Sequence, residues 1–131
     1  MLDGVALEYS LYKRALLDLL PNLAIQEIRV TGGGEKSSTW NQIKADRLQI
    51  PVVSVERTGG TPMGSALIAG FGVGLFNSLP AAASEWVHLG DTYAPDRSKS
   101  KLAGERIQKY AHLLQMVDAW SRKDSTAMCE L

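Results

Sequence analysis

The sequence has a single cysteine, Cys129, two histidines and no excess charge of either sign. One cysteine cannot form an internal disulfide, so a reducing compartment such as the cytoplasm is the expected location. Fourteen basic residues balance fourteen acidic residues, and this balance provides no overall field to attract nucleic acid or an anionic membrane. His88 and His112 stand far apart with no ligand-spaced cluster around them, so we expect no metal site.

Long hydrophobic runs are also missing. The richest stretch, residues 63–76, is about 14 residues long and contains four glycines, whereas a membrane-spanning helix needs about 20 apolar residues. The N-terminus lacks the order of charged, apolar and small residues that marks a signal peptide. We therefore expect a soluble protein without a membrane partner.

The chain has 131 residues, 45% of them hydrophobic and 21% charged, which suits one soluble globular domain. Its apolar spacing predicts helices over 2–20, 39–48, 81–88 and 102–120, and a glycine-rich helix that Thr61 caps and Pro62 opens. Because each glycine weakens a helix by about 1 kcal/mol relative to alanine, so many of them suggest the close approach of another backbone. Thr39 and Gln42 have the spacing of a capping box. Strands are predicted over 25–31 and 51–55, followed by an irregular crossing over 91–99 and a frayed tail over 122–131. This order indicates an α/β fold whose sheet is parallel where helices connect its strands.

The first predicted helix begins at Met1 without a capping residue. We therefore expect that further sequence once preceded it, and that this helix and the 25–31 strand packed against strands that are missing here. Removing those neighbours would leave an unpaired strand edge and an apolar patch. The resulting expectation is a homo-oligomer with its contact at these two elements.

Residues 28–40 read as a strand, a triple-glycine turn and the start of a helix. Glycines allow a ligand to approach the backbone closely, and the N–H groups and dipole of a helix start attract phosphate. Lys36 and Ser37 could add a positive charge and a hydroxyl. The run matches neither the G-x-G-x-x-G fingerprint nor a Walker P-loop. On these grounds alone, a simple tight turn is the commoner explanation of such a run.

A set of motifs along the chain makes the assignment more specific. Residues 30–37 (VTGGGEKS), together with Trp40, the Q-I and A-D pairs of the next helix and the P-V pair at 51–52, resemble the xylulokinase pattern V-T-G-G-G-A-K-S-x-x-W-x-Q-I-x-A-D-x-x-x-x-P-V. Residues 64–70 (GSALIAG) resemble its G-A-A-x-x-A-G helix, 93–96 (YAPD) its Y-x-P-D motif, and 2–4 (LDG) its L-E-G. In this order the chain resembles the C-terminal, ATP-binding part of the FGGY carbohydrate kinases over nearly its whole length.

The resemblance implies part of an actin-like, ribonuclease-H-type ATPase domain, with a short, mainly parallel sheet flanked by helices. It implies ATP and Mg²⁺ as cofactors of the parent enzyme. It also implies that Gly32, Gly33 and Gly34 lie against the α-phosphate and ribose of the nucleotide, with Ser37 beside the adenine. Glu35 replaces the usual alanine and is expected to face solvent.

No catalytic residue is expected in the chain. The family's Asp-Gly-Thr phosphate turn and its catalytic aspartate have no counterpart in this sequence. We therefore expect residues 1–131 to be an inactive fragment of a kinase for D-xylulose or a related ketose or polyol, with the sugar contacted by the missing lobe. One alternative is a free-standing, non-catalytic interaction or regulatory domain. Another is a phosphate-binding module unrelated to kinases.

Three residues beside the turn have simpler explanations than chemistry. Gln42 and Asp46 lie four residues apart on one helix face, and we expect them to hold a neighbouring loop by hydrogen bonds. Trp40 is expected to pack the glycine turn onto the helix, with stacking near adenine as a lesser alternative.

Overall fold

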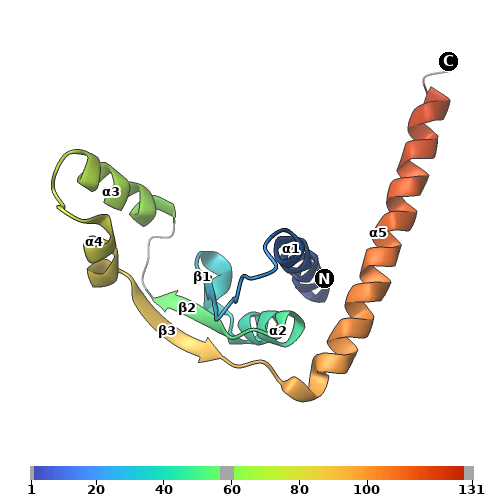
Figure 1. Ribbon diagram of the computed structural model, residues 1–131, viewed down its shortest axis with the longest axis horizontal. Coiled ribbons are helices and arrows are strands. Elements are labelled where there is room, and N and C mark those ends of the chain that lie inside the picture. The colour runs from blue at the N-terminus through green and yellow to red at the C-terminus, as the bar shows by residue number, and fades with distance from the viewer. Residues whose placement is uncertain (1, 57–60, 129–131) are drawn as a thin grey trace.

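A computed structural model describes residues 2–56 and 61–128 of the chain (Figure 1). Its elements follow in the order α1 (Leu2–Leu19), β1 (Ile28–Val30), the 3-10 turn η1 (Gly33–Lys36), α2 (Ser38–Leu48), β2 (Val52–Glu56), α3 (Thr61–Gly72), α4 (Leu79–Trp86), β3 (His88–Tyr93), the 3-10 turn η2 (Arg97–Lys99) and α5 (Ser100–Met128). The predicted α/β class and the helices near the predicted ranges are confirmed. The cap proposed at Thr61, and the Glu35 and Cys129 side chains, lie outside what the structure describes.

The sheet has three strands in the order β1-β2-β3. β1 pairs in parallel with β2, with Ile28 opposite Val52, as expected for strands joined by a helix. β3 pairs antiparallel with β2, so the sheet is mixed, and part of the predicted irregular crossing is a strand. The sequence did not predict β3, because the β3 side chains are mostly exposed and show no regular apolar alternation; its pairing with the β2 backbone is what makes it a strand.

Gly90 shows how closely β3 approaches β2. A Cβ placed on Gly90 would lie 2.7 Å from Ser54 Oγ and 2.8 Å from Glu56 Cγ. Ser54 Oγ also donates a hydrogen bond of 3.2 Å to the carbonyl of Asp91. A larger residue at position 90 would therefore force the Ser54 and Glu56 side chains on the neighbouring strand to move.

β1 is shorter than the 25–31 strand that the sequence predicts. Its ladder starts where the Ile28 N–H donates to the Pro51 carbonyl at 2.9 Å, and it ends with Val30 opposite Ser54. Residues 25–27 precede the paired part of β2 and therefore have no partner in this ladder. The strand prediction is thus wrong at its N-terminal end.

The core lies where α1, α2 and β2 meet. Val52, Ala6 and Ala45 are fully buried, one on each of these elements. Ser10 Oγ donates to the Ala6 carbonyl at 3.0 Å and approaches the Arg47 carbonyl at 3.4 Å. Small side chains on α1 and α2 therefore allow the two helices to pack closely.

Charged side chains join α5 to the same core. Asp3 on α1 accepts hydrogen bonds from Arg47 on α2 and from Arg106 on α5, the latter at 2.7 Å. Burial raises the Asp3 pKa, but the hydrogen bonds and charges of the two arginines outweigh this effect and hold the pKa below its usual value. Tyr110 on α5 donates to Glu8 on α1 at 2.7 Å.

Two parts of the chain extend away from this core. The α3–α4 pair lies beyond one side of the sheet, and α5 projects from the other (Figure 1). The α5 helix continues to Met128, past Ser121, where the sequence placed the start of a frayed tail. Its outer apolar residues Leu113, Met116, Val117 and Trp120 are each more than half exposed.

The glycines of α3 were expected to permit close approach of another backbone. Among the described residues, a Cβ at Gly64 or Gly72 would have no neighbour within 4 Å, whereas a Cβ at Gly70 would lie 2.6 Å from the Phe76 ring. Phe76 in turn packs edge-to-face on Trp86, with ring centroids 5.4 Å apart. Gly70 therefore makes room for an aromatic side chain, and that expectation is wrong at this position.

Across residues 2–56 and 61–128, no helix combines the length and apolar character that membrane crossing requires. Self-association through α1 or the 25–31 segment stays a prediction.

Candidate functional site: the glycine turn and the adjoining groove

The glycine turn connects the end of β1 to the start of α2. Gly32 has φ 95° and ψ −173°, and Gly33–Lys36 then form a single 3-10 turn. Ser37 is extended and caps α2, with its Oγ accepting a hydrogen bond of 3.2 Å from the Trp40 N–H. The capping box predicted at Thr39 and Gln42 is therefore wrong, because the 3-10 turn delivers Ser37 to the capping position.

The three glycines differ in whether the described part of the chain requires a glycine at their position. Gly32 adopts a backbone conformation that is essentially restricted to glycine. A Cβ on Gly34 would lie 3.4 Å from the Trp40 ring, which is an ordinary contact distance, so Gly34 packs beneath that side chain but is not required there for lack of space. Gly33 is the most open of the three, because its φ is not positive and a Cβ there would have no described atom within 4 Å. Nothing in the described part of the chain requires a glycine at position 33.

The structure places all four predicted contact residues on one exposed surface. Gly32, Gly33, Gly34 and Ser37 are each exposed, within six consecutive positions of the chain. The Ser37 oxygen accepts the capping bond, so its hydroxyl proton remains able to donate. The turn therefore offers backbone and hydroxyl groups to a ligand, next to the positive end of the α2 dipole.

Gln42 and Asp46 have the supporting role that the sequence predicts. Gln42 Nε2 donates to Asp46 Oδ1 and to the Ala94 carbonyl, both at 2.9 Å. Asp46 also accepts from the Asp96 N–H at 3.0 Å and from Lys99 Nζ at 2.8 Å. Together these contacts hold residues 94–99 against α2, the helix that follows the glycine turn.

The electrostatics of Asp46 follow from these contacts. Burial raises the pKa of its carboxyl group, but the hydrogen bonds from Lys99, Asp96 and Gln42 outweigh burial and bring the pKa below its usual value. Asp46 is therefore ionised at neutral pH and holds the 94–99 segment as a charged acceptor.

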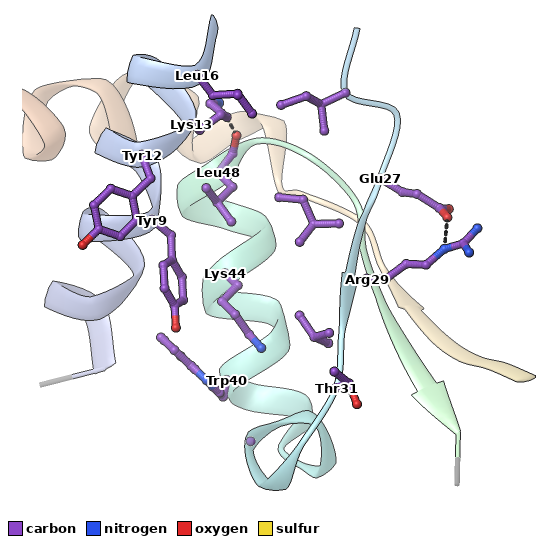
Figure 2. A pocket seen from close by; sticks show the side chains of 14 residues that line it. Tyr9, Tyr12, Lys13, Leu16, Glu27, Arg29, Thr31, Trp40, Lys44 and Leu48 are labelled. Carbon is purple, nitrogen blue, oxygen red and sulfur yellow. Dashed lines mark hydrogen bonds and ion pairs between the residues drawn. The ribbon is translucent and has the colours of Figure 1, made fainter. Parts of the chain in front are cut away.

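A groove of about 810 Å³ adjoins the turn (Figure 2). It lies between α1 and the 25–31 segment, with α2 beneath it. Its lining is Tyr9, Tyr12, Lys13, Leu16, Ile25, Glu27, Ile28, Arg29, Val30, Thr31, Gly34, Trp40, Lys44 and Leu48. The groove is thus mainly apolar and aromatic, and it contains two lysines.

The two lysines are situated differently. Lys13 Nζ donates to the Leu48 carbonyl at 2.6 Å, where a cation complements the C-terminal end of α2. Lys44 is only 6% exposed, and its ammonium lies 5.2 Å from the centroid of the Trp40 ring. Desolvation by burial lowers the pKa of both lysines.

Lys44 is a largely buried lysine to which no described acid supplies a counter-charge. Within the described residues its ammonium forms no ion pair and no hydrogen bond. A cation–π contact contributes about 0.5–2 kcal/mol, whereas removing an ammonium from water costs on the order of several kcal/mol. Lys44 Nζ is not among the fully enclosed polar atoms that lack a partner, so the ammonium keeps some contact with water and the Trp40 ring offsets part of the remaining cost.

Lys44 and Lys13 were not predicted as site residues from the sequence. A signal for Lys44 was available, because Trp40, Lys44 and Leu48 follow one another at four-residue spacing and so share one helix face. A lysine between two apolar residues on such a face indicates a cation directed toward packed surface.

Metal-binding clusters of three or more His, Cys, Asp or Glu side chains do not occur in the part of the chain that the structure describes.

The α/β fold, with its strand–glycine turn–helix junction, is the fold of the actin-like kinases. Residues 1–73 match the family described as "FGGY family of carbohydrate kinases, C-terminal domain". The chain belongs to the FGGY family of carbohydrate kinases and corresponds to part of their C-terminal domain.

Individual relatives agree with this assignment. The chain is 28% identical to xylulose kinase of Bacillus subtilis (strain 168) over 116 residues, which are 88% of the chain and 21% of that protein. It is 38% identical to L-fuculokinase of Escherichia coli (strain K12) over 78 residues, 60% of the chain and 16% of that protein. The crystal structure of xylulose kinase from Rhodospirillum rubrum superposes with a TM-score of 0.70 at 27% identity, covering 91% of the chain and 24% of that structure. The chain thus spans about a fifth of the length of these relatives.

Proposed function

We propose that this chain forms the nucleotide-facing part of an ATP-dependent sugar kinase. In this proposal Gly32, Gly33 and Gly34 lie against the α-phosphate and ribose of the nucleotide, and Ser37 lies beside the adenine. The observation that carries the proposal is Gly33, which is exposed and has no described neighbour that would exclude a side chain. A glycine that its own chain does not require is expected where a ligand must approach the backbone.

The residues present fit one side of a nucleotide. The turn offers backbone N–H groups, the Ser37 hydroxyl and the positive end of α2, all of which suit an anionic phosphate. When bound, ATP with Mg²⁺ supplies the phosphoryl group and neutralises its charge. The role of this chain in the reaction is to bind and orient the nucleotide.

For the complete kinase we propose D-xylulose or a related ketose or polyol as the substrate. Two of the relatives described above are xylulose kinases, and a third is an L-fuculokinase. The sugar contacts would come from the larger part of the enzyme, since this chain matches only about a fifth of those proteins. The lone cysteine suits a reducing compartment, so we also propose a cytoplasmic location.

ADP is expected to bind weakly at the glycine turn. One side of a cleft supplies few contacts, so we expect a Kd of about 1 mM or weaker, corresponding to roughly −4 kcal/mol. In an NMR titration of labelled protein, the amide signals of Gly33, Gly34 and Ser37 should move first.

A matched pair of variants tests the position of the site. Gly33→Val places a side chain where the chain itself has open space, so it should abolish these shifts without lowering Tm appreciably. Gly104→Ala on α5 also enters open space and should leave the shifts unchanged. Nucleotide shifts confined to α5 would rule out the glycine turn as the binding site.

The isolated chain is expected to show no sugar-dependent ATP consumption. Phosphoryl transfer requires a base, metal ligands and a phosphate cradle held in line, and the glycine turn supplies part of the cradle. A coupled ADP-release assay with xylulose, glycerol, ribulose or gluconate should remain at background. Turnover that Gly33→Val abolishes would overturn this proposal.

A further inference from the structure

Trp40 supports the glycine turn at two points. Its backbone N–H donates to Ser37 Oγ at 3.2 Å, and its ring packs on Gly34, where a Cβ would lie 3.4 Å from the indole atoms Cδ1 and Nε1. Both contacts join α2 to the turn that is proposed to bind the nucleotide. A displaced indole ring would leave the turn without its support at Gly34.

Lys44 contacts the same indole ring. It follows Trp40 by four residues, so the two side chains share one face of α2. Side chains of an α-helix point back toward its N-terminus, and the Lys44 side chain lies beside Trp40 on α2 in Figure 2. The Lys44 ammonium lies over the ring, 5.2 Å from its centroid. The indole thus touches Gly34 through one edge and carries the ammonium over its face.

Folding by itself gives little reason for a charge at position 44. Lys44 is only 6% exposed, and within the described residues its ammonium forms no ion pair and no hydrogen bond. Removing an ammonium from most of its water costs more than one aromatic ring returns. A methionine would fill similar space without this cost. The charge is therefore expected to serve something other than stability.

We propose that Lys44 is a positioning residue, whose ammonium holds the Trp40 ring against Gly34 and thereby keeps the glycine turn in the conformation that binds the nucleotide. This inference rests on the proposed function, because the turn is the proposed nucleotide site. Lys44 itself touches no nucleotide. It acts through Trp40, by a contact in which a positive charge faces the negative face of the ring.

Two other roles of Lys44 lead to different results. If only the aliphatic stem of Lys44 packs, Lys44→Met should behave like the parent chain. If the ammonium attracts the phosphates directly, the effect of removing it should shrink as salt screens the charge. In the positioning role the charge matters, the effect passes through Trp40, and it persists in salt.

Three variants of the 131-residue chain separate these roles. Lys44→Met removes the charge and keeps a side chain of similar length. Lys44→Arg keeps a cation that stacks well on aromatic rings, so it should restore the parent behaviour. Lys13→Met is the matched control, because Lys13 is the other lysine of the groove and donates to the Leu48 carbonyl at 2.6 Å instead of lying over a ring.

NMR without nucleotide reports the state of the ring and the turn. In Lys44→Met the Trp40 indole N–H and the Gly34 amide should lose order on the picosecond to nanosecond timescale, seen as lower heteronuclear NOE values. Lys44→Arg and Lys13→Met should keep the parent values. Parent values in Lys44→Met would overturn the proposal.

Titration with ADP reports the consequence for binding. The Kd of Lys44→Met should be at least about threefold weaker than that of the parent chain, by the same factor at about 50 and 300 mM salt. In a Trp40→Leu background, Lys44→Met should cause no further loss, because the two residues act through one contact. A loss that persists in that background, or that disappears at high salt, would show that Lys44 does not act through the ring.

Thermal unfolding separates positioning from general destabilisation. The Tm of Lys44→Met should not be lower than that of the parent chain, because relief of the burial cost offsets the lost ring contact. A Tm that falls together with ADP affinity would overturn the positioning role. The nucleotide-free signals do not depend on ADP, so the two proposals fail separately. Absence of ADP binding by the parent chain would refute the proposed function, whereas an unchanged ring and turn in Lys44→Met would refute the role of Lys44.

Discussion

Asp46→Ala is expected to lower the free energy of unfolding by about 2–3 kcal/mol. The substitution removes the acceptor of the Asp96 N–H and one acceptor of Gln42, and it leaves Lys99 without one of its two carboxylate partners. The 94–99 segment should then separate from α2. Chemical denaturation gives the stability, and faster exchange of the Asp96 amide reports the local release.

Lys99→Ala is the matched control for Asp46. The Lys99 side chain is 47% exposed, so solvent screening limits its contribution to stability. Its loss should lower the free energy of unfolding by less than about 1 kcal/mol. Equal effects of the two substitutions would contradict the view that the buried carboxylate organises the network. Equally, an unchanged Asp96 amide in Asp46→Ala would show that other contacts hold the segment.

The Asp46 network should also make stability depend on pH. Its folded-state pKa lies below the ordinary value of 3.8, so its contribution is present above that pH and is lost as the pH falls through the folded pKa. The acid-induced loss of stability should therefore be smaller in Asp46→Ala than in the parent chain.

Val52→Ala is expected to lower the free energy of unfolding by about 2 kcal/mol, the second large effect. Val52 is fully buried at the centre of the sheet, between β1 and β3. Removing two methyl groups loses their burial and leaves a cavity that the paired strands cannot close. Denaturant unfolding should show a lower midpoint with an unchanged m-value.

Val73→Ala makes the same chemical change at a site that is 76% exposed. It should alter the free energy of unfolding by less than about 0.5 kcal/mol. Similar losses in both variants would mean that the sheet does not form the stability core of this chain.

Some of the site could be predicted because its signals are local. A strand that runs into three glycines and then a helix is readable at residues 28–40, and the structure has this order. Gln42 and Asp46 share a helix face through their spacing, and both contact the 94–99 segment. Trp40 packs on Gly34, as predicted for an aromatic residue that follows the glycine turn by only a few positions.

Other features depended on partners far away in the chain. β3 has no apolar alternation and becomes a strand because β2 offers its second edge. Ser37 replaces Thr39 as the cap because a 3-10 turn changes where α2 begins. The position of Lys44 in a groove could not be predicted, because α1 and the 25–31 segment, which form the groove walls, are distant from Lys44 in sequence.

The sequence by itself determined the α/β class, the position of the glycine turn and the family, because these depend on local conformational preference and on motifs in order. Only the tertiary structure decided which glycine has open space around it, which edge of β1 has no partner strand among the described residues, and which lysine has no described acid beside it. Those properties depend on what surrounds a residue in space. The surroundings of Gly33, Arg29 and Lys44 are set by elements distant from them in sequence or by open space that no described element fills.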